Sequence, residues 1–253
     1  MKALLKPFLG GVMQGERTDG ELSAARSIQL DALPVDFADD VFAALRPARD
    51  VGGDLYDFVR KGDRMSFIVC DASGRGIRSA VFSVMADTAF RMACCMDLDA
   101  GEIVGRINQT LAFRNERSMF ATAFVGVLDV RTGDLEFACA GQNPPVVISP
   151  DGTARFLRLH RDPPMGVLEK KCFGLQRTRL EPGARLLAYT DGVTEAIRAD
   201  YAQFGDGRLL EYAATCKGRG VREIVNGLLE TVDGFVAGAE QTDDITIMAI
   251  ECR

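Results

Sequence analysis

The sequence has a single histidine, no Cys-x-x-Cys pair, no long apolar run and no excess of basic residues. His160 lies in a polar segment at a strand end, so we expect a surface side chain and not the base of a Ser-His-Asp hydrolase. The seven cysteines are odd in number and scattered. They argue against disulfides and a thiolate zinc site, and are typical of a reducing cytoplasm.

Further absences narrow the classes of partner and of enzyme. No apolar run approaches the ~18 residues that cross a bilayer, and we expect neither a signal peptide nor a membrane span. The net charge is −6, whereas nucleic-acid binding needs a basic surface. The phosphate-binding motif G-x-x-x-x-G-K-[ST] is missing. Neither Cys70, in an apolar run, nor Cys172 matches the Cys-x5-Arg site of a cysteine phosphatase.

What the sequence does contain is a short apolar run that ends in an acid. Residues 67–71 read as a buried strand ending at Asp71, and Gly74 and Gly76 then provide a sharp turn. Taken alone, Asp71 would be a helix cap. The same arrangement of an acid at a strand end, usually beside glycine, recurs at other places: Asp54, Asp191, and Asp243 with Asp244.

Carboxylates from several strand ends can converge only if something positive neutralises them. Oxygen ligands select Mg²⁺ or Mn²⁺ over zinc. Four acids exceed what one magnesium usually takes, so the pattern points to two divalent ions ~3.5–4 Å apart. For each acid taken singly, a capping or turn role remains open.

The order of elements predicts an α+β fold. Strands on short turns run through residues 41–45, 55–59, 67–71, 121–130, 135–140, 145–149, 155–159, 173–180, 185–190 and 245–251, and helices are expected at 21–30, 77–96, 100–115, 208–216 and 221–237. The nearly all-apolar run 121–130 is expected at the centre of its sheet. Strands in succession, with helices before and after them, suggest antiparallel sheets with helices outside.

We expect one domain, residues 35–253. It is preceded by a helix, residues 21–34, with a regulatory or linker role, and by a flexible segment or linker, residues 1–20. In the helix at 77–96, one mainly apolar stripe should pack on a sheet; its residues are Ile77, Ala80, Val81, Val84, Met85, Thr88, Ala89, Met92 and Met96.

Seven motifs resemble, in order, those of the metal-dependent PPM (type 2C-like) protein phosphatases, and most closely their bacterial SpoIIE/RsbU branch. They are VGGDLYDF, IVCDASGRGIRSA, FATAFVGVLD, AGQNPP, PPMGV, LLAYTDGVTEA and TDDITIM. The resemblance covers roughly residue 21 to the C-terminus. It implies an α-β-β-α sandwich of two stacked, mainly antiparallel sheets.

The resemblance also implies roles for the acids. Asp71 would bridge two metals, helped by the Ala72 carbonyl; Asp54 would serve the second metal, and Asp191 and Asp243 the first. Asp243 fits the Asp-x-x-Thr spacing to Thr246, and Asp244 is the alternative ligand. Ser73 stands where eukaryotic relatives have a histidine, which would leave protonation of the leaving group to water, and Gln142 replaces a histidine common in the branch.

The resulting hypothesis is a serine/threonine protein phosphatase in which a hydroxide bridging two Mn²⁺ or Mg²⁺ ions attacks phosphorus. The resemblance suggests that the substrate is a small phosphorylated regulator of the anti-sigma-factor antagonist type. The alternative is a weakly active or inactive module that binds phosphoproteins or dimerises. A homodimer through the N-terminal helix is also possible, since Leu22, Ile28 and Leu30 could pair with a second copy.

Overall fold

The computed structural model describes residues 10–116 and 118–253, and the side chains from residue 20 onward. Its strands form two five-stranded antiparallel sheets. One sheet has the order β1-β10-β9-β6-β7, built from Val41–Arg46, Ile245–Glu251, Arg185–Tyr189, Val146–Ile148 and Ala154–Phe156. The other has the order β2-β3-β4-β5-β8, built from Asp54–Lys61, Arg64–Ala72, Ala121–Asp129, Asp134–Ala140 and Gln176–Arg179.

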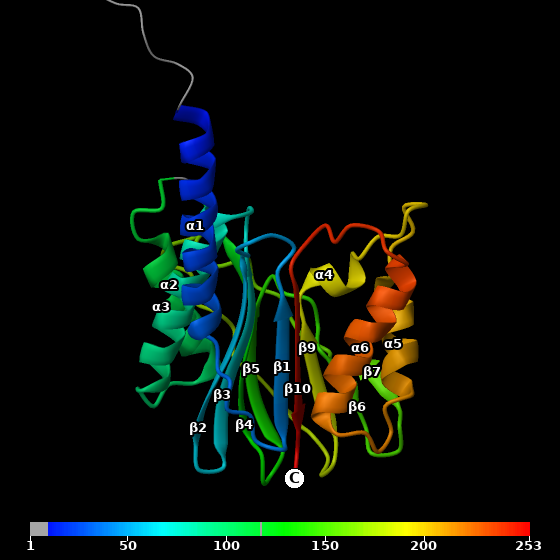
Figure 1. Cartoon of the computed structure of the whole chain (residues 1–253). Coiled ribbons are helices and arrows are strands. Elements are labelled where there is room, and N and C mark those ends of the chain that lie inside the picture. The colour runs from blue at the N-terminus through cyan, green and yellow to red at the C-terminus, as the bar shows by residue number, and fades with distance from the viewer. Residues whose placement is uncertain (1–9, 117) are drawn as a thin grey trace, which may run out of the picture.

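The sheets stack face to face and helices cover both outer faces, which confirms the expected α-β-β-α sandwich (Figure 1). Helices α2 (Ile77–Cys94) and α3 (Ala100–Ala112) lie on the β2–β8 sheet, and α5 (Gly205–Ala214) and α6 (Val221–Val236) lie on the other. The short helix α4, Asp191–Thr194, was not expected from the sequence. β4 is central in its sheet, as predicted.

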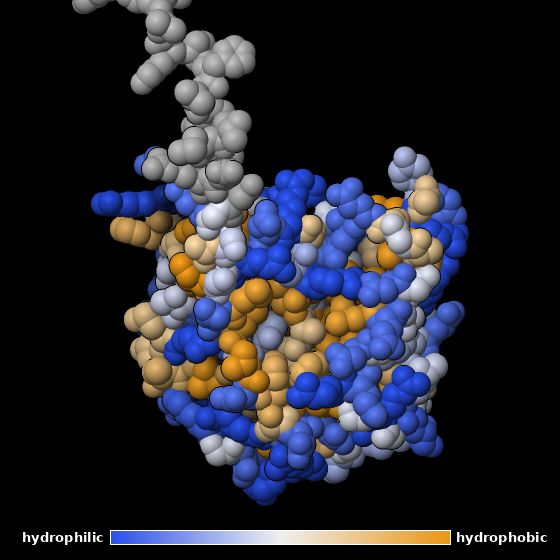
Figure 2. Space-filling view, in the orientation of Figure 1, coloured by the Kyte–Doolittle hydropathy of each residue, from blue (hydrophilic) through white to orange (hydrophobic). Residues whose placement is uncertain are grey.

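The hydrophobic core has two parts. The larger fills the space between the sheets and under α2 and α3, and the smaller lies between the β1–β7 sheet and α5 and α6. β1 and β2 are the edge strands at the open side of the sandwich. In the space-filling view, hydrophobic residues gather in the middle of this side with hydrophilic residues around them (Figure 2). The Phe37 ring lies 4.9 Å from that of Phe42 on β1 and 5.9 Å from that of Phe58 on β2, so it packs against both edge strands.

The orientation expected for α2 is wrong for the large side chains of the stripe, although Ala80 and Ala89 are buried as expected. Ile77, Val81, Met92 and Met96 are about half exposed or more, with Met92 at 67%. The face that packs on the sheet carries small, aromatic and polar residues; these are Ser79, Ala80, Phe82, Ser83, Ala86, Asp87, Ala89, Phe90, Ala93 and Cys94. The inward polar side chains have partners along the helix itself: the Ser79 and Ser83 hydroxyls donate to carbonyls three residues earlier, and Asp87 pairs with Arg91 one turn later. For α3 the expected inward residues are buried, which confirms the prediction.

The N-terminal helix α1 spans Gly10–Asp31 and packs against α2. It begins earlier than the sequence suggested, so residues 10–20 are helical, although we expected a flexible segment or linker there. Residues 1–9 of that segment lie outside the described residues. The N-terminal part of α1 extends beyond the end of the sheets (Figure 1). Its regulatory or dimerising role stays a prediction.

Candidate metal centre

The acids singled out in the sequence lie at one end of the sandwich, on strand ends of both sheets. Asp54 begins β2 and faces Asp71, near the end of β3, as a directly opposed cross-strand pair. Asp191 begins α4, with one residue between it and the end of β9, and Asp243 directly precedes Asp244 and β10. The polypeptide therefore brings the four expected acids to the same end, where the two sheets meet.

Electrostatics show how closely the acids interact. Burial, followed by repulsion from Asp191, Asp243 and Asp244, raises the pKa of Asp71 to about 7. Burial, followed by Glu195 and Asp243, raises the pKa of Asp191 to about 6. Carboxylates that disfavour one another's charge in this way would be stabilised by a cation.

Asp54 is the most buried of the proposed ligands, at 2% exposure. Burial and the neighbouring Asp71 raise its pKa well above the ordinary value, while hydrogen bonding from Thr190 opposes this rise. The Thr190 hydroxyl donates to Asp54 Oδ2 at 2.7 Å and accepts from the Thr246 amide at 2.9 Å. Sequence analysis missed Thr190, although it directly precedes Asp191.

Glycines leave room for the backbone at this end. A Cβ on Gly53 would overlap the carbonyl oxygen of Ala72, which is the backbone group proposed as a ligand, and a Cβ on Gly192 would overlap the carbonyl oxygen of Asp244. The Ala72 carbonyl can therefore lie this close to residue 53, which precedes Asp54, only because residue 53 is a glycine. Gly74 and Gly76 have φ of 94° and 76°, as the sharp turn after Asp71 requires.

Asp244 has a different role from Asp243. Its Oδ1 accepts a hydrogen bond from the Ala48 amide and its Oδ2 one from the Gly53 amide, both at 2.7 Å. Both oxygens thus hold the loop that precedes Asp54. The Asp243 carboxylate accepts only the neighbouring Asp244 amide, at 2.9 Å, among the described hydrogen bonds. This difference favours Asp243 as the ligand and Asp244 as the residue that anchors the loop.

The two residues that depart from the family motifs, Ser73 and Gln142, make hydrogen bonds that hold the fold together. The Ser73 hydroxyl accepts the Phe120 amide at 2.9 Å and so fixes the approach to β4. Gln142 is buried between the sheets, where its side-chain nitrogen donates to the Tyr189 carbonyl at 3.0 Å and its oxygen accepts from the Thr122 hydroxyl. Gln142 therefore links the sheets and does not point to a ligand role.

The acids fit a divalent-cation site in donor chemistry, in mutual repulsion and in the glycine cradle beside the Ala72 carbonyl. Their side chains share one end of the sandwich, but they are not arranged as a ligand group. Among residues 10–116 and 118–253, no three His, Cys, Asp or Glu side chains already form a group that could hold a metal ion. Asp71, Asp191 and Asp243 are partly exposed, whereas Asp54 is buried.

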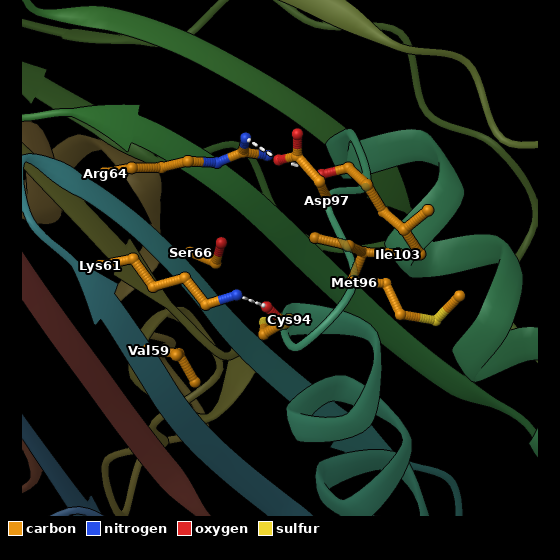
Figure 3. A pocket seen from close by; sticks show the side chains of 9 residues that line it. Val59, Lys61, Arg64, Ser66, Cys94, Met96, Asp97 and Ile103 are labelled. Atoms are coloured by element: carbon orange, nitrogen blue, oxygen red, sulfur yellow. Dashed lines mark hydrogen bonds and ion pairs between the residues drawn. The ribbon is translucent and has the colours of Figure 1, made fainter.

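Other candidate sites are weaker. A pocket of about 30 Å³ lies at the far end of the β2–β3 hairpin, lined in part by Lys61, Arg64 and Asp97 (Figure 3). Lys61 Nζ donates to the Cys94 carbonyl at 2.7 Å, and Arg64 pairs with Asp97 at 2.7 Å. A space of this volume holds about one water. These contacts tie the end of α2 to the hairpin and leave no room for a ligand.

The cysteines and the histidine carry no catalytic site. All seven cysteines are free. Cys216 and Arg222 do have the Cys-x5-Arg spacing, which sequence analysis overlooked, but Cys216 is fully buried and its thiol contacts the Tyr212 carbonyl at 3.4 Å. The His160 side chain is 76% exposed, as expected.

Fold and site together define the class: a PPM (type 2C-like) phosphatase domain. The comparisons with known proteins specify the family. The model of the family described as Stage II sporulation protein E (SpoIIE) matches residues 61–253, and the chain belongs to this family. No helix among the described residues is long and apolar enough to cross a membrane.

Individual relatives agree with this assignment. The chain is 28% identical to Protein IcfG of Synechocystis over 99% of its length and 44% of that protein's, and 26% identical to Phosphoserine phosphatase RsbP of Bacillus subtilis over 73% and 47%. It thus spans about half the length of these relatives. The SiaA-PP2C domain of Pseudomonas aeruginosa has the same fold, with a TM-score of 0.84, 21% identity, and coverage of 94% of this chain and 98% of that one.

Proposed function

We propose that this domain hydrolyses phosphoserine or phosphothreonine on a partner protein and uses two divalent cations, Mn²⁺ or Mg²⁺. Asp54, Asp71, Asp191, Asp243 and the Ala72 carbonyl would hold the cations. The observation that carries the proposal is the gathering of these acids from both sheets at one end, with raised pKa values for Asp54, Asp71 and Asp191. Membership in a phosphatase family supports it.

When bound, the cations would lower the pKa of a water nucleophile and offset the charge on the phosphoryl oxygens. The chain's own residues would set the geometry. Asp71 and Asp54, opposed across β2 and β3, present two carboxylates on one rigid ladder. Asp191 and Asp243 approach from the other sheet, and Thr190 holds Asp54 in place.

The rim of the site has cationic side chains suited to a phosphorylated substrate. Arg49 and Arg75 are exposed and line a small depression beside Asp243 and Asp244. Guanidinium groups bind phosphate well because they present several N–H donors in one plane. A small phosphorylated regulator of the anti-sigma-factor antagonist type is the substrate class that we propose from the family resemblance.

Phosphate release from a phosphoserine peptide and from an aryl phosphate, measured with and without Mn²⁺, tests the proposal. We expect Mn²⁺-dependent release by the parent chain and a loss of at least about 100-fold in Asp71→Asn, with the fold retained by circular dichroism. Asp63→Asn is the matched control, since Asp63 lies in the turn at the other end of the same hairpin and is exposed.

Two results would contradict the proposal. Absence of release by the parent at millimolar Mn²⁺ would favour the alternative, a phosphoprotein-binding or dimerising module without turnover. Release by Asp71→Asn at the parent's rate would show that the acids are not the site of hydrolysis.

A further inference from the structure

Exposed apolar side chains gather in one region of the described surface. Twelve large apolar side chains are exposed among the described residues, and nine of them belong to α2, the C-terminal end of α3 and the loops beside these helices. Single exposed apolar residues need no explanation, whereas a group of this kind indicates an interaction surface. The nine are Ile77, Val81, Met85, Met92, Met96, Phe113, Phe120, Val167 and Leu168.

The member of this group that is joined to the candidate metal centre is Phe120, which is 41% exposed. The Ser73 amide donates to the Phe120 carbonyl at 2.8 Å, and the Phe120 amide donates to the Ser73 hydroxyl at 2.9 Å. Ser73 lies two residues after Asp71. Phe120 is therefore fixed directly beside the turn that follows this acid.

The loop after Met165 runs next to the start of β4. Met165 and Ala121 exchange backbone hydrogen bonds of 3.0 and 2.8 Å. A Cβ on Gly166 would lie 2.9 Å from the Met119 carbonyl oxygen and 3.4 Å from the ring of Phe82 on α2. The loop therefore lies between the segment that precedes β4 and the first two turns of α2, beside the same end of the domain.

Val167 and Leu168 are 55% and 51% exposed, although the backbone of their loop is held in place. The buried Asn108 side chain accepts the Gly166 amide at 2.8 Å and donates to the Leu168 carbonyl at 2.9 Å. Asn115 donates to the Gly166 carbonyl at 3.2 Å. A partner that binds these two side chains need not order the loop first, so little conformational entropy is lost on binding.

Cationic side chains adjoin the same turn. Arg75 lies within it and Arg78 in the first turn of α2, and both are exposed. Guanidinium groups bind phosphate well. An occupant that fits this end of the domain therefore has a phosphate group for the arginines and the metal centre, and apolar side chains next to it. A free phosphate lacks the apolar part, and an unmodified second copy of this chain lacks the phosphate, whereas a phosphorylated protein has both.

We propose that Phe120, Val167 and Leu168 form a docking surface for the phosphorylated protein substrate and select a phosphoserine that is flanked by apolar side chains. This inference rests on the proposed function, because it takes the phosphoserine to lie at the metal centre. The three side chains would contact the substrate beside its phosphate and are not among the proposed ligands. They therefore act on the choice of substrate and not on the hydrolysis itself.

Two synthetic phosphoserine peptides of equal length test the proposal, one with leucine and the other with glutamine on both sides of the phosphoserine. An aryl phosphate is the substrate without flanking residues. The variant combines Val167→Ser with Leu168→Ser. Met96→Ser is the matched control, because Met96 is exposed to a similar extent, at 49%, but lies beyond the far end of α2. The measurements are kcat/KM with Mn²⁺ and the binding of both peptides, fluorescently labelled, by anisotropy.

In the parent chain we expect kcat/KM to be about 10-fold higher or more for the leucine-flanked peptide than for the glutamine-flanked one. The double variant should lose this preference through a higher KM and should release phosphate from the aryl phosphate within about 2-fold of the parent's rate. Met96→Ser should keep the preference. If the double variant does not fold, Phe120→Gln decides by the same measurements.

Equal kcat/KM values for the two peptides in the parent would overturn the inference, as would an equal loss of preference in Met96→Ser. Self-association of the parent in sedimentation velocity, abolished by the double variant and without any preference between the peptides, would assign the surface to a second copy of the chain instead.

Failure of the proposed function has a different signature. A parent chain that releases phosphate from neither peptide nor the aryl phosphate would contradict hydrolysis. Anisotropy would then still decide the docking surface, because the leucine-flanked peptide should bind the parent about 10-fold more tightly than the glutamine-flanked one. Equal affinities would overturn the inference in that case too.

Discussion

The hydroxyl of Thr190 donates a hydrogen bond of 2.7 Å to Oδ2 of Asp54, and this bond joins the two sheets inside the candidate metal centre. Thr190 follows β9 in one sheet, while Asp54 begins β2 in the other. The same hydroxyl accepts the amide of Thr246, at the start of β10. One side chain therefore connects β2, which carries Asp54, β9, which precedes Asp191, and β10, which follows Asp243.

Thr190→Val tests this connection. Valine has the shape of threonine but leaves the buried Asp54 carboxyl and the Thr246 amide without a partner, so we expect the free energy of unfolding to fall by about 1–3 kcal/mol. Thr190→Ser, which keeps the hydroxyl, should lose less. Urea unfolding of the three proteins measures the difference, and equal stabilities of the valine and serine variants would contradict the account.

Two neighbouring buried acids, Asp57 on β2 and Asp87 on α2, lie outside the metal centre. Asp57 on β2 is 1% exposed and contacts Arg91 on α2, with 2.8 Å between Asp57 Oδ2 and Arg91 Nε. Burial, followed by repulsion from Asp87, raises the pKa of Asp57 from 3.8 to about 8, and Arg91 opposes this rise. Arg91 also donates to the Ala32 carbonyl, just after α1.

This pair predicts a pH dependence of stability. The folded protein binds the Asp57 proton more tightly than the unfolded chain does, so the contribution to stability falls as the pH rises from about 4 to about 8. In the variant Asp57→Asn this loss should be smaller by about 1–3 kcal/mol between pH 5.5 and 8.5. Urea unfolding in the presence of a chelator measures it, and parallel pH profiles would count against the assignment.

The orientation of α2 gives a prediction with two matched substitutions. Met92 is 67% exposed and Phe90 is fully buried. Met92→Gln should change the free energy of unfolding by less than about 0.5 kcal/mol, whereas Phe90→Ala should lower it by about 3–5 kcal/mol. Thermal and urea unfolding compare the two, and the reverse ranking would restore the orientation expected from the apolar stripe.

The glycine at the start of α4 predicts a local steric effect. A Cβ on Gly192 would overlap the backbone carbonyl of Asp244, which cannot move without displacing β10. Gly192→Ala should therefore lower stability and Mn²⁺ affinity together. Gly105→Ala is the control, because Gly105 lies within α3 with no heavy atom within 4 Å of its Cβ position. That change should raise the free energy of unfolding by about 0.5–1 kcal/mol.

Much of the fold could be predicted because strand and turn signals are local. The hairpin turn at residues 131–134 and the inward face of α3 both follow from patterns within one element. The face of α2 could not be predicted in this way. That face depends on contacts between elements, such as the pairing of Arg91 on α2 with Asp57 on β2, and the apolar stripe does not reflect such contacts.

The same distinction applies to the site. The acids could be found because each lies at a strand end beside turn residues. The roles of Thr190 and Asp244 could not, because each depends on a hydrogen bond to a residue at least 136 positions away. Such contacts leave no pattern in a single sequence.

The central claim is that acids from both sheets bind divalent cations, and calorimetric titration of metal-free protein with Mn²⁺ tests it most directly. We predict binding of two Mn²⁺ per chain, with binding lost or strongly weakened in Asp71→Asn and Asp191→Asn and unchanged in Asp63→Asn. No binding at millimolar Mn²⁺, or binding by Asp71→Asn equal to that of the parent, would contradict the claim.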